Sequence, residues 1–190
     1  MNYTFKFFNK KSLLKSLLLL PLLASYLPFQ LNPAKANVEF QWDTDSGYKR
    51  LKWHQTRSQK NAKNKIFFFL RPSSRKTGLL SLNIKFPEKL KSSIKTKNVS
   101  LCKVNIGGFD SKTKCLQNIP SDIELDNENN SVDILPISPL PTSKDSYAIV
   151  LKMINPQRSG LYQFHSFGKS SGNVPISSYL GSWTINIDQQ

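Results

Sequence analysis

The chain of 190 residues is strongly basic, with 27 lysines and arginines against 12 acidic residues and a formal net charge of +15. Its hydrophobic content of 38%, including 12 Phe, 6 Tyr and 3 Trp, excludes a disordered chain, because it supplies enough apolar surface for a core. The length suits one domain with an accessory segment.

The first 36 residues are a predicted secretory signal peptide. Four lysines precede a short apolar run at Leu17–Leu23, and Ala34-Lys35-Ala36 places small residues where a signal peptidase cuts. We predict cleavage after Ala36, which leaves residues 37–190 as a single domain. The alternative is an uncleaved anchor, since Leu13–Leu31 approaches the roughly 20 apolar residues that span a bilayer, although a lysine and two prolines interrupt it.

Short β-strands are predicted along the first half of the remaining chain. They are Val38–Trp42, Tyr48–Gln55, Lys65–Arg71, Leu79–Phe86 and Val99–Ile106. Most alternate with period two, which indicates one buried and one solvent face. In the fourth strand we expect Leu80, Leu82, Ile84 and Phe86 to face inward. The run Ile66–Leu70 is apolar throughout, as in a central strand buried on both faces, and Pro72 ends it. We expect at most one short helical turn within Glu88–Lys97.

The second half continues with strands and short polar connections. The predicted strands are Lys114–Gln117, Ser131–Pro136, Tyr147–Met153, Leu161–Phe167 and Tyr179–Ile187, with an extended edge segment through Pro136, Pro139 and Pro141. In the last strand, Tyr179, Gly181, Trp183, Ile185 and Ile187 are predicted to share one face. Short connections favour antiparallel pairing. We therefore predict an all-β fold with little or no helix after the signal peptide: an antiparallel β-sandwich of nine or ten short strands, of which the immunoglobulin-like fold is one form.

The two cysteines, Cys102 and Cys115, follow the export signal, so we expect a disulfide between them outside the cytosol. It would close a loop of about 14 residues and stabilise the fold by roughly 3 kcal/mol. Cys102 shares a face with Val104 and Ile106, which would shield its sulfur. A catalytic thiolate would need a neighbouring histidine, and zinc would need more ligands than two cysteines supply.

Catalytic and metal-binding motifs are missing from the sequence. Neither His54 nor His165 lies in a metal-ligand spacing, and the chain has no nucleophile elbow and no phosphate-binding glycine loop. We predict no catalytic residue, no metal site and no cofactor. The alternative is a small exported hydrolase or transferase whose site is assembled from distant residues.

The charge is unevenly distributed. Between Lys49 and Lys114 there are 18 basic residues against two acidic ones, whereas Asp122–Asp133 holds five acids and no base. Such asymmetry favours anionic partners, and the alternative is a face that only keeps the protein soluble. The predicted binding residues are Arg50, Lys52, Arg57, Lys60 and Lys63, of which the last three lie in a loop without acids.

Several short motifs, in order, resemble a cyanobacterial family of exported proteins that is known only as a domain of unknown function. The motifs are Phe40-Gln41-Trp42, Tyr48–Gln55, Phe67–Pro72, Asn155-Pro156, Gly160–Phe164 and Tyr179–Trp183. Leu101–Val104 followed by Gly107-Gly108-Phe109 resembles a subset from marine unicellular members. The resemblance covers residues 38–188 and implies an exported all-β domain. It implies no activity.

These observations predict an exported, non-enzymatic envelope protein in the periplasm, the thylakoid lumen or at the cell surface. Its expected partner is an anionic envelope component or another envelope protein, and no nucleic acid. We expect no transmembrane helix in the mature chain. A periplasmic or lumenal assembly factor is a further alternative.

Overall fold

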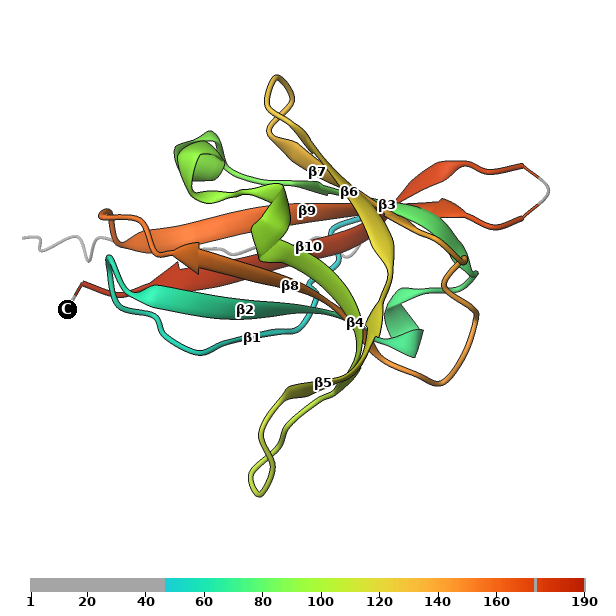
Figure 1. Cartoon of the computed structure of the whole chain (residues 1–190), viewed down its shortest axis with the longest axis horizontal. Helices are drawn as coiled ribbons and strands as arrows, with labels where there is room; N and C mark the ends of the chain where they lie inside the picture. The colour runs from blue at the N-terminus through green and yellow to red at the C-terminus, as the bar shows by residue number, and fades with distance from the viewer. Residues whose placement is uncertain (1–46, 173, 190) are drawn as a thin grey trace, which may run out of the picture. The chain divides into compact units, whose positions relative to one another are not determined.

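The computed structural model describes residues 47–172 and 174–189, which belong to one compact unit, Asp43–Gln190. The predicted signal peptide, its cleavage site and the predicted strand Val38–Trp42 lie outside the described residues. The described chain forms two five-stranded antiparallel sheets (Figure 1). The predicted all-β sandwich is therefore confirmed.

The first sheet has the order β1 (Trp53–Gln55), β2 (Lys63–Leu70), β8 (Tyr147–Ile154), β4 (Val99–Asn105) and β5 (Lys114–Ile119). The second sheet has the order β10 (Ser177–Ile187), β9 (Gly160–Ser170), β3 (Leu79–Lys85), β7 (Ser131–Pro136) and β6 (Ser121–Asp126). Within the described residues, three short 3-10 helices connect the strands: η3 (Pro72–Ser74), η4 (Glu88–Ser93) and η5 (Thr96–Asn98). The expectation of at most one helical turn within Glu88–Lys97 is wrong, because η4 and η5 both begin there.

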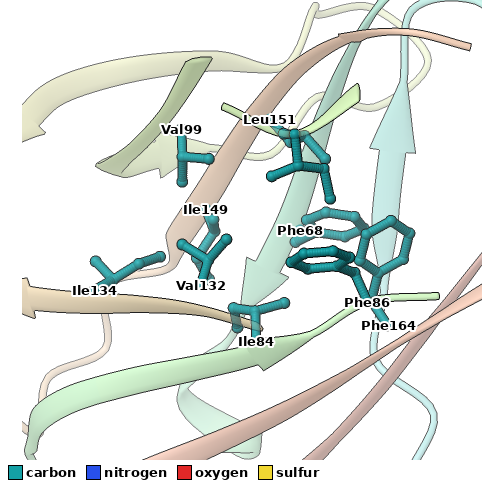
Figure 2. A pocket seen from close by; sticks show the side chains of 10 residues that line it. Phe68, Ile84, Phe86, Val99, Val132, Ile134, Ile149, Leu151 and Phe164 are labelled. Atoms are coloured by element: carbon teal, nitrogen blue, oxygen red, sulfur yellow. The ribbon is translucent and has the colours of Figure 1, made fainter. Parts of the chain in front are cut away.

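The main core lies between the two sheets and contains an aromatic cluster. The ring centre of Phe68 lies 4.7 Å from that of Phe164 and 4.9 Å from that of Trp183, and the Trp183 indole donates to the Phe69 carbonyl at 3.3 Å. A cavity of about 20 Å³ remains beside Phe68, and Figure 2 shows apolar side chains of both sheets around it. Ligand sites are usually larger than about 300 Å³, so this cavity is a packing void.

The first sheet is also apolar on its outer face, the face turned away from the second sheet. Phe67, Phe69, Cys102, Val104, Ala148 and Val150 form a second buried cluster there. This explains the continuous apolar run of β2, because alternate residues of that strand enter the two clusters.

The predicted strand Tyr48–Gln55 is only partly formed, because this segment pairs with both sheets. Leu51 donates its N–H to the Ser182 carbonyl at 2.8 Å, and Ser182 donates to the Lys49 carbonyl at 2.7 Å. From Lys52 onward the chain pairs with β2: the Lys52 carbonyl accepts the Phe69 N–H at 3.1 Å, and Trp53 to Gln55 form the paired strand β1. The segment therefore joins the edge of β10 to the edge of the first sheet.

Two β-bulges change predicted side-chain faces. Leu79 pairs with Ser170 of β9 and Ser81 pairs with Lys169, so Leu80 is an extra residue in β3. As a result, Leu79 is buried and Leu80 is only half-buried. A second shift between Tyr179 and Gly181 turns Tyr179 to the outer face of the second sheet. Each bulge inserts one residue and reverses the alternation on one side of it.

Strand β6 is absent from the sequence prediction. Ile123 and Leu125 pack against the core and alternate with acidic side chains, which the prediction treated only as a charged cluster. The alternation Asp122-Ile123-Glu124-Leu125-Asp126 is the signal that identifies this strand.

The proline-rich segment after β7 runs along the end of β3, as predicted for an extended segment. Leu79 and Leu140 exchange two backbone hydrogen bonds of 2.9 and 2.8 Å. The buried guanidinium of Arg75 donates to the carbonyls of Pro141 and Asp145, each at 2.7 Å, and stacks on the Tyr147 ring. Burial lowers the pKa of Arg75.

The predicted disulfide between Cys102 and Cys115 is confirmed, with a Cα–Cα distance of 5.7 Å. Cys102 is 1% exposed and lies in the outer cluster, whereas Cys115 is exposed. Val104 pairs with Cys115 and Lys103 with Gln117, so Leu116 is an inserted residue. This bulge turns Cys115 to the face that Cys102 occupies.

Candidate functional site

A groove rich in lysines lies where β2 begins and β8 ends, beside η4 and η5. We name it the lysine groove, because Lys63, Lys65, Lys95, Lys97 and Lys152 line it. Its volume is about 620 Å³, and no carboxylate occurs among the described residues around it. Thr56, Ser92, Ser93 and Asn98 add hydroxyl and amide groups, and Met153 and Ile154 add apolar surface.

Tertiary structure brings these lysines together from three separate segments. Lys63 and Lys65 lie on β2, and Lys152 lies on β8 directly opposite Lys65 in the register. Lys95 directly precedes η5, and Lys97 lies within it. η5 packs against β8. Like charges directly opposite on a sheet destabilise it, so the Lys65–Lys152 pair has a cost.

The groove lysines have no anionic partner in the described part of the chain. The one ion pair there joins Lys103 to Asp145 at 2.8 Å, away from the groove. Lys65 is half-buried, and its Nζ lies 4.7 Å from the centre of the Phe67 ring. The other four lysines are exposed. Their charges are thus available to an external anion.

Two buried asparagines hold the loop that joins β1 to β2 above this groove. Asn64 Oδ1 accepts the N–H groups of Thr56 at 3.2 Å and Arg57 at 3.1 Å. Asn64 Nδ2 donates to Asn155 Oδ1 at 2.9 Å, and Asn155 Nδ2 donates to the Gln59 carbonyl at 2.8 Å. The cationic loop is therefore anchored to β2 and to the end of β8.

A second groove adjoins the first on the outer face of the first sheet. We name it the hairpin groove, since His54, Lys65 and Phe67 line one side and residues 107–113 of the β4–β5 hairpin line the other. Its volume is about 660 Å³, and it shares Thr56 and Lys65 with the lysine groove. Figure 1 shows this hairpin projecting beyond the two sheets.

The tip of the hairpin is a tight turn that presents Phe109, which is 104% exposed. Gly107 donates its N–H to Thr113 Oγ1 at 3.0 Å, and Gly108 donates to the Ser111 carbonyl at 3.0 Å. A Cβ at Gly107 would lie 2.5 Å from the Ser111 carbonyl oxygen, so the turn requires glycine. The Cys102–Cys115 disulfide closes the base of the hairpin.

The five predicted binding residues occupy different places. Lys63 lines the lysine groove, and Arg57 and Lys60 lie on the adjoining loop. Lys52 is exposed, and its backbone carbonyl accepts the N–H of Phe69. Arg50 is exposed at the edge of β10, where it forms a bridge with Ser182. The structure thus groups Lys63 with Lys65 and with three lysines that the prediction did not name.

Sequence reasoning missed Lys95, Lys97 and Lys152. Four lysines within residues 89–97 gave a signal for the η4–η5 region, but nothing local connects that region to β8. Lys152 alternates with apolar neighbours like any exposed strand residue. Only the pairing of β2 with β8 places it opposite Lys65.

One serine–histidine pair lies elsewhere, on the outer face of the second sheet. His165 Nδ1 and Ser182 Oγ are 2.7 Å apart, and Tyr179 Oη lies 2.6 Å from the same oxygen. Ser182 is 0% exposed, so its hydroxyl cannot meet a substrate in this structure. The contact instead links β9 to the bulged start of β10.

Among the described residues, no group of three or more His, Cys, Asp or Glu side chains could hold a metal ion. His54 and Asp110 both line the hairpin groove. A nucleophile hydrogen-bonded to a base is the arrangement that covalent catalysis needs. In the described part of the chain, neither His54 nor Asp110 is hydrogen-bonded to a hydroxyl or thiol that could act as such a nucleophile. Within residues 47–172 and 174–189, no helix has the length and hydropathy of a membrane span.

A family model described as "Protein of unknown function (DUF2808)" matches residues 40–187. No curated protein matches the chain. Among solved structures, the bacterial hydrophobin BslA is 13% identical, with a TM-score of 0.47 over 75% of this chain and 97% of its own. A collagen-binding domain of a Staphylococcus aureus adhesin is 14% identical, with a TM-score of 0.39 over 71% and 95%. An uncharacterized Nocardia farcinica protein with an immunoglobulin-like fold is 9% identical, with a TM-score of 0.44 over 73% and 97%.

Proposed function

We infer that this chain, which belongs to the DUF2808 family, is an exported, non-enzymatic protein that binds an anionic component of the cell envelope through the lysine groove. The observation that carries this proposal is the groove itself: five lysines converge from three segments, without a described carboxylate among them.

The Lys65–Lys152 pair supports a binding role over a role in solubility alone. Solubility requires only that charge be spread over the surface, and spread charges avoid mutual repulsion. Here two cations are directly opposite on neighbouring strands, and three more line the same concave surface. A bound anion would be attracted to both cations, which offsets their mutual repulsion, and the summed field would speed its association.

The predicted loop residues extend the same positive region. Arg57 and Lys60 lie on the loop that Asn64 and Asn155 anchor beside the groove, so their charges add to its field. We propose that Lys52 and Arg50 contribute more weakly, because they lie outside the groove, in the segment that leads to the edge of β10.

The proposed location is outside the cytosol. The disulfide supports an oxidising compartment, and the predicted signal peptide with cleavage after Ala36 supports export of a single domain, residues 37–190. The resemblance to exported cyanobacterial proteins supports the periplasm, the thylakoid lumen or the cell surface as the compartment.

A charge-matched pair of variants tests the proposal. In the groove variant, Lys95→Glu, Lys97→Glu and Lys152→Glu are combined. In the control variant, the exposed residues Lys76, Lys144 and Lys169, which lie outside the groove, are changed to Glu. Both variants lose the same net charge. Elution from a sulfated dextran column with a salt gradient measures the binding.

We expect the groove variant to elute at much lower salt than wild type and the control variant to elute near wild type. Exposed charge changes alter stability by less than roughly 0.5 kcal/mol, so both variants should fold. Equal shifts for the two variants would contradict the proposal and leave net charge as the whole explanation.

A further inference from the structure

We propose that the anionic component is an acidic polysaccharide chain that lies across the lysine groove and the hairpin groove in succession. This inference rests on the proposed function and identifies the class of its ligand. The two grooves share Thr56 and Lys65, so a chain that leaves one enters the other. Each has the volume of a site for a small molecule, and together they form an extended track.

The two grooves offer complementary chemistry. The lysine groove supplies cations for carboxylate or sulfate groups, with the hydroxyls of Ser92 and Ser93 as hydrogen-bonding partners. The hairpin groove supplies aromatic surface at Phe109 and His54 and polar groups at Ser111 and Thr113. Sugars present anionic groups, hydroxyls and apolar C–H faces along a single chain, and this track has a partner for each.

The hairpin wall is rigid before a ligand arrives. The disulfide fixes its base, and the two hydrogen bonds from Gly107 and Gly108 fix its tip. Because these contacts fix the backbone that carries the fully exposed Phe109, less backbone freedom is lost on binding, which favours affinity.

A membrane surface fits the same residues less well. A bilayer presents a broad anionic plane, whereas the lysines line a concave groove that a flat surface does not enter. Asp110 follows Phe109 at the tip, and its carboxylate would be repelled by anionic headgroups if the phenylalanine inserted between lipids. An extended chain meets neither obstacle.

Calorimetric titration of the whole mature protein with oligogalacturonates of two and of about eight units tests the chain-like ligand. We expect the longer chain to bind at least about tenfold more tightly, because it contacts both grooves at once. The Phe109→Ala variant should lose about tenfold in affinity for the longer chain and none for the dimer. Leu116→Ala, which removes an exposed apolar side chain of the same hairpin outside the groove, is the control.

Three outcomes would overturn the inference. They are equal affinity for the two chain lengths, an equal effect of Phe109→Ala and Leu116→Ala, and tighter, Phe109-dependent binding to phosphatidylglycerol vesicles than to the longer chain. In each case the groove variant would still lose binding to sulfated dextran if the proposed function holds. If that variant instead binds sulfated dextran like wild type, the proposed function itself fails.

Discussion

Gly181 occupies a position that only glycine can fill. Its φ angle is +140°, and a Cβ there would lie 2.6 Å from the Lys49 carbonyl oxygen and 2.7 Å from the Leu51 side chain. These are the contacts by which the segment before β1 pairs with β10. The glycine therefore allows the join between the two sheets, and it follows the bulge that turns Tyr179 outward.

Replacing this glycine should be costly. We expect Gly181→Ala to lower the free energy of unfolding by about 2–4 kcal/mol, because strain at positive φ adds to overpacking against Lys49 and Leu51. Urea unfolding measures the change. Gly172→Ala is the matched control, since a Cβ at Gly172 meets no atom within 4 Å. Similar losses for the two variants would show that the close approach at Gly181 is unimportant.

Asn155 is another residue whose side chain determines local structure. It is 2% exposed, accepts from Asn64 and donates to the carbonyls of Arg57 and Gln59. We expect Asn155→Ala to destabilise the fold by about 2–3 kcal/mol, because the buried amide of Asn64 and the part-buried carbonyls of Arg57 and Gln59 lose their partner. Hydrogen exchange should also become faster in residues 56–62.

The exposed neighbour Gln157 provides the control for this experiment. Gln157→Ala should change the free energy of unfolding by less than about 0.5 kcal/mol and leave exchange in the loop unchanged. If both variants behave alike, the asparagine pair does not hold the cationic loop.

At the scale of elements, the β4–β5 hairpin combines a bulge, a disulfide and a glycine turn. The inserted residue Leu116 brings Cys115 to the face of Cys102. The bond then ties a projecting element to Cys102, a buried residue of the outer cluster. The hairpin can thus extend from the sandwich without losing its orientation.

Removing this bond should lower the stability of the fold. Changing Cys102 and Cys115 together to Ala should cost about 3 kcal/mol of unfolding free energy, chiefly because the unfolded chain gains freedom. Urea unfolding with and without reductant gives the same comparison for the wild type. Equal free energies for the oxidised and reduced wild type would contradict a stabilising role for the disulfide.

At the scale of the whole molecule, opposite charges are segregated between elements. The groove lysines lie on β2 and β8 and in or beside η5, whereas Asp122, Glu124 and Asp126 alternate with core residues along β6 of the second sheet. On β6, hydrogen bonds from Asn129 and Glu128 lower the pKa of the Asp126 carboxyl. The molecule therefore presents a positive region at the lysine groove and a negative strand on the other sheet, which orients it in the field of a charged surface.

The sequence by itself determined most strand-forming segments, the all-β class and the disulfide, because period-two alternation and cysteine count are local properties of the chain; β6 and the start of β1 were exceptions. Tertiary structure decided which face of the sheet the side chains of Leu80 and Tyr179 occupy, since a bulge depends on the register with a partner strand. It also decided the groove. Lys65 and Lys152 lie far apart in sequence and meet only because β2 pairs with β8, and no local pattern encodes that pairing.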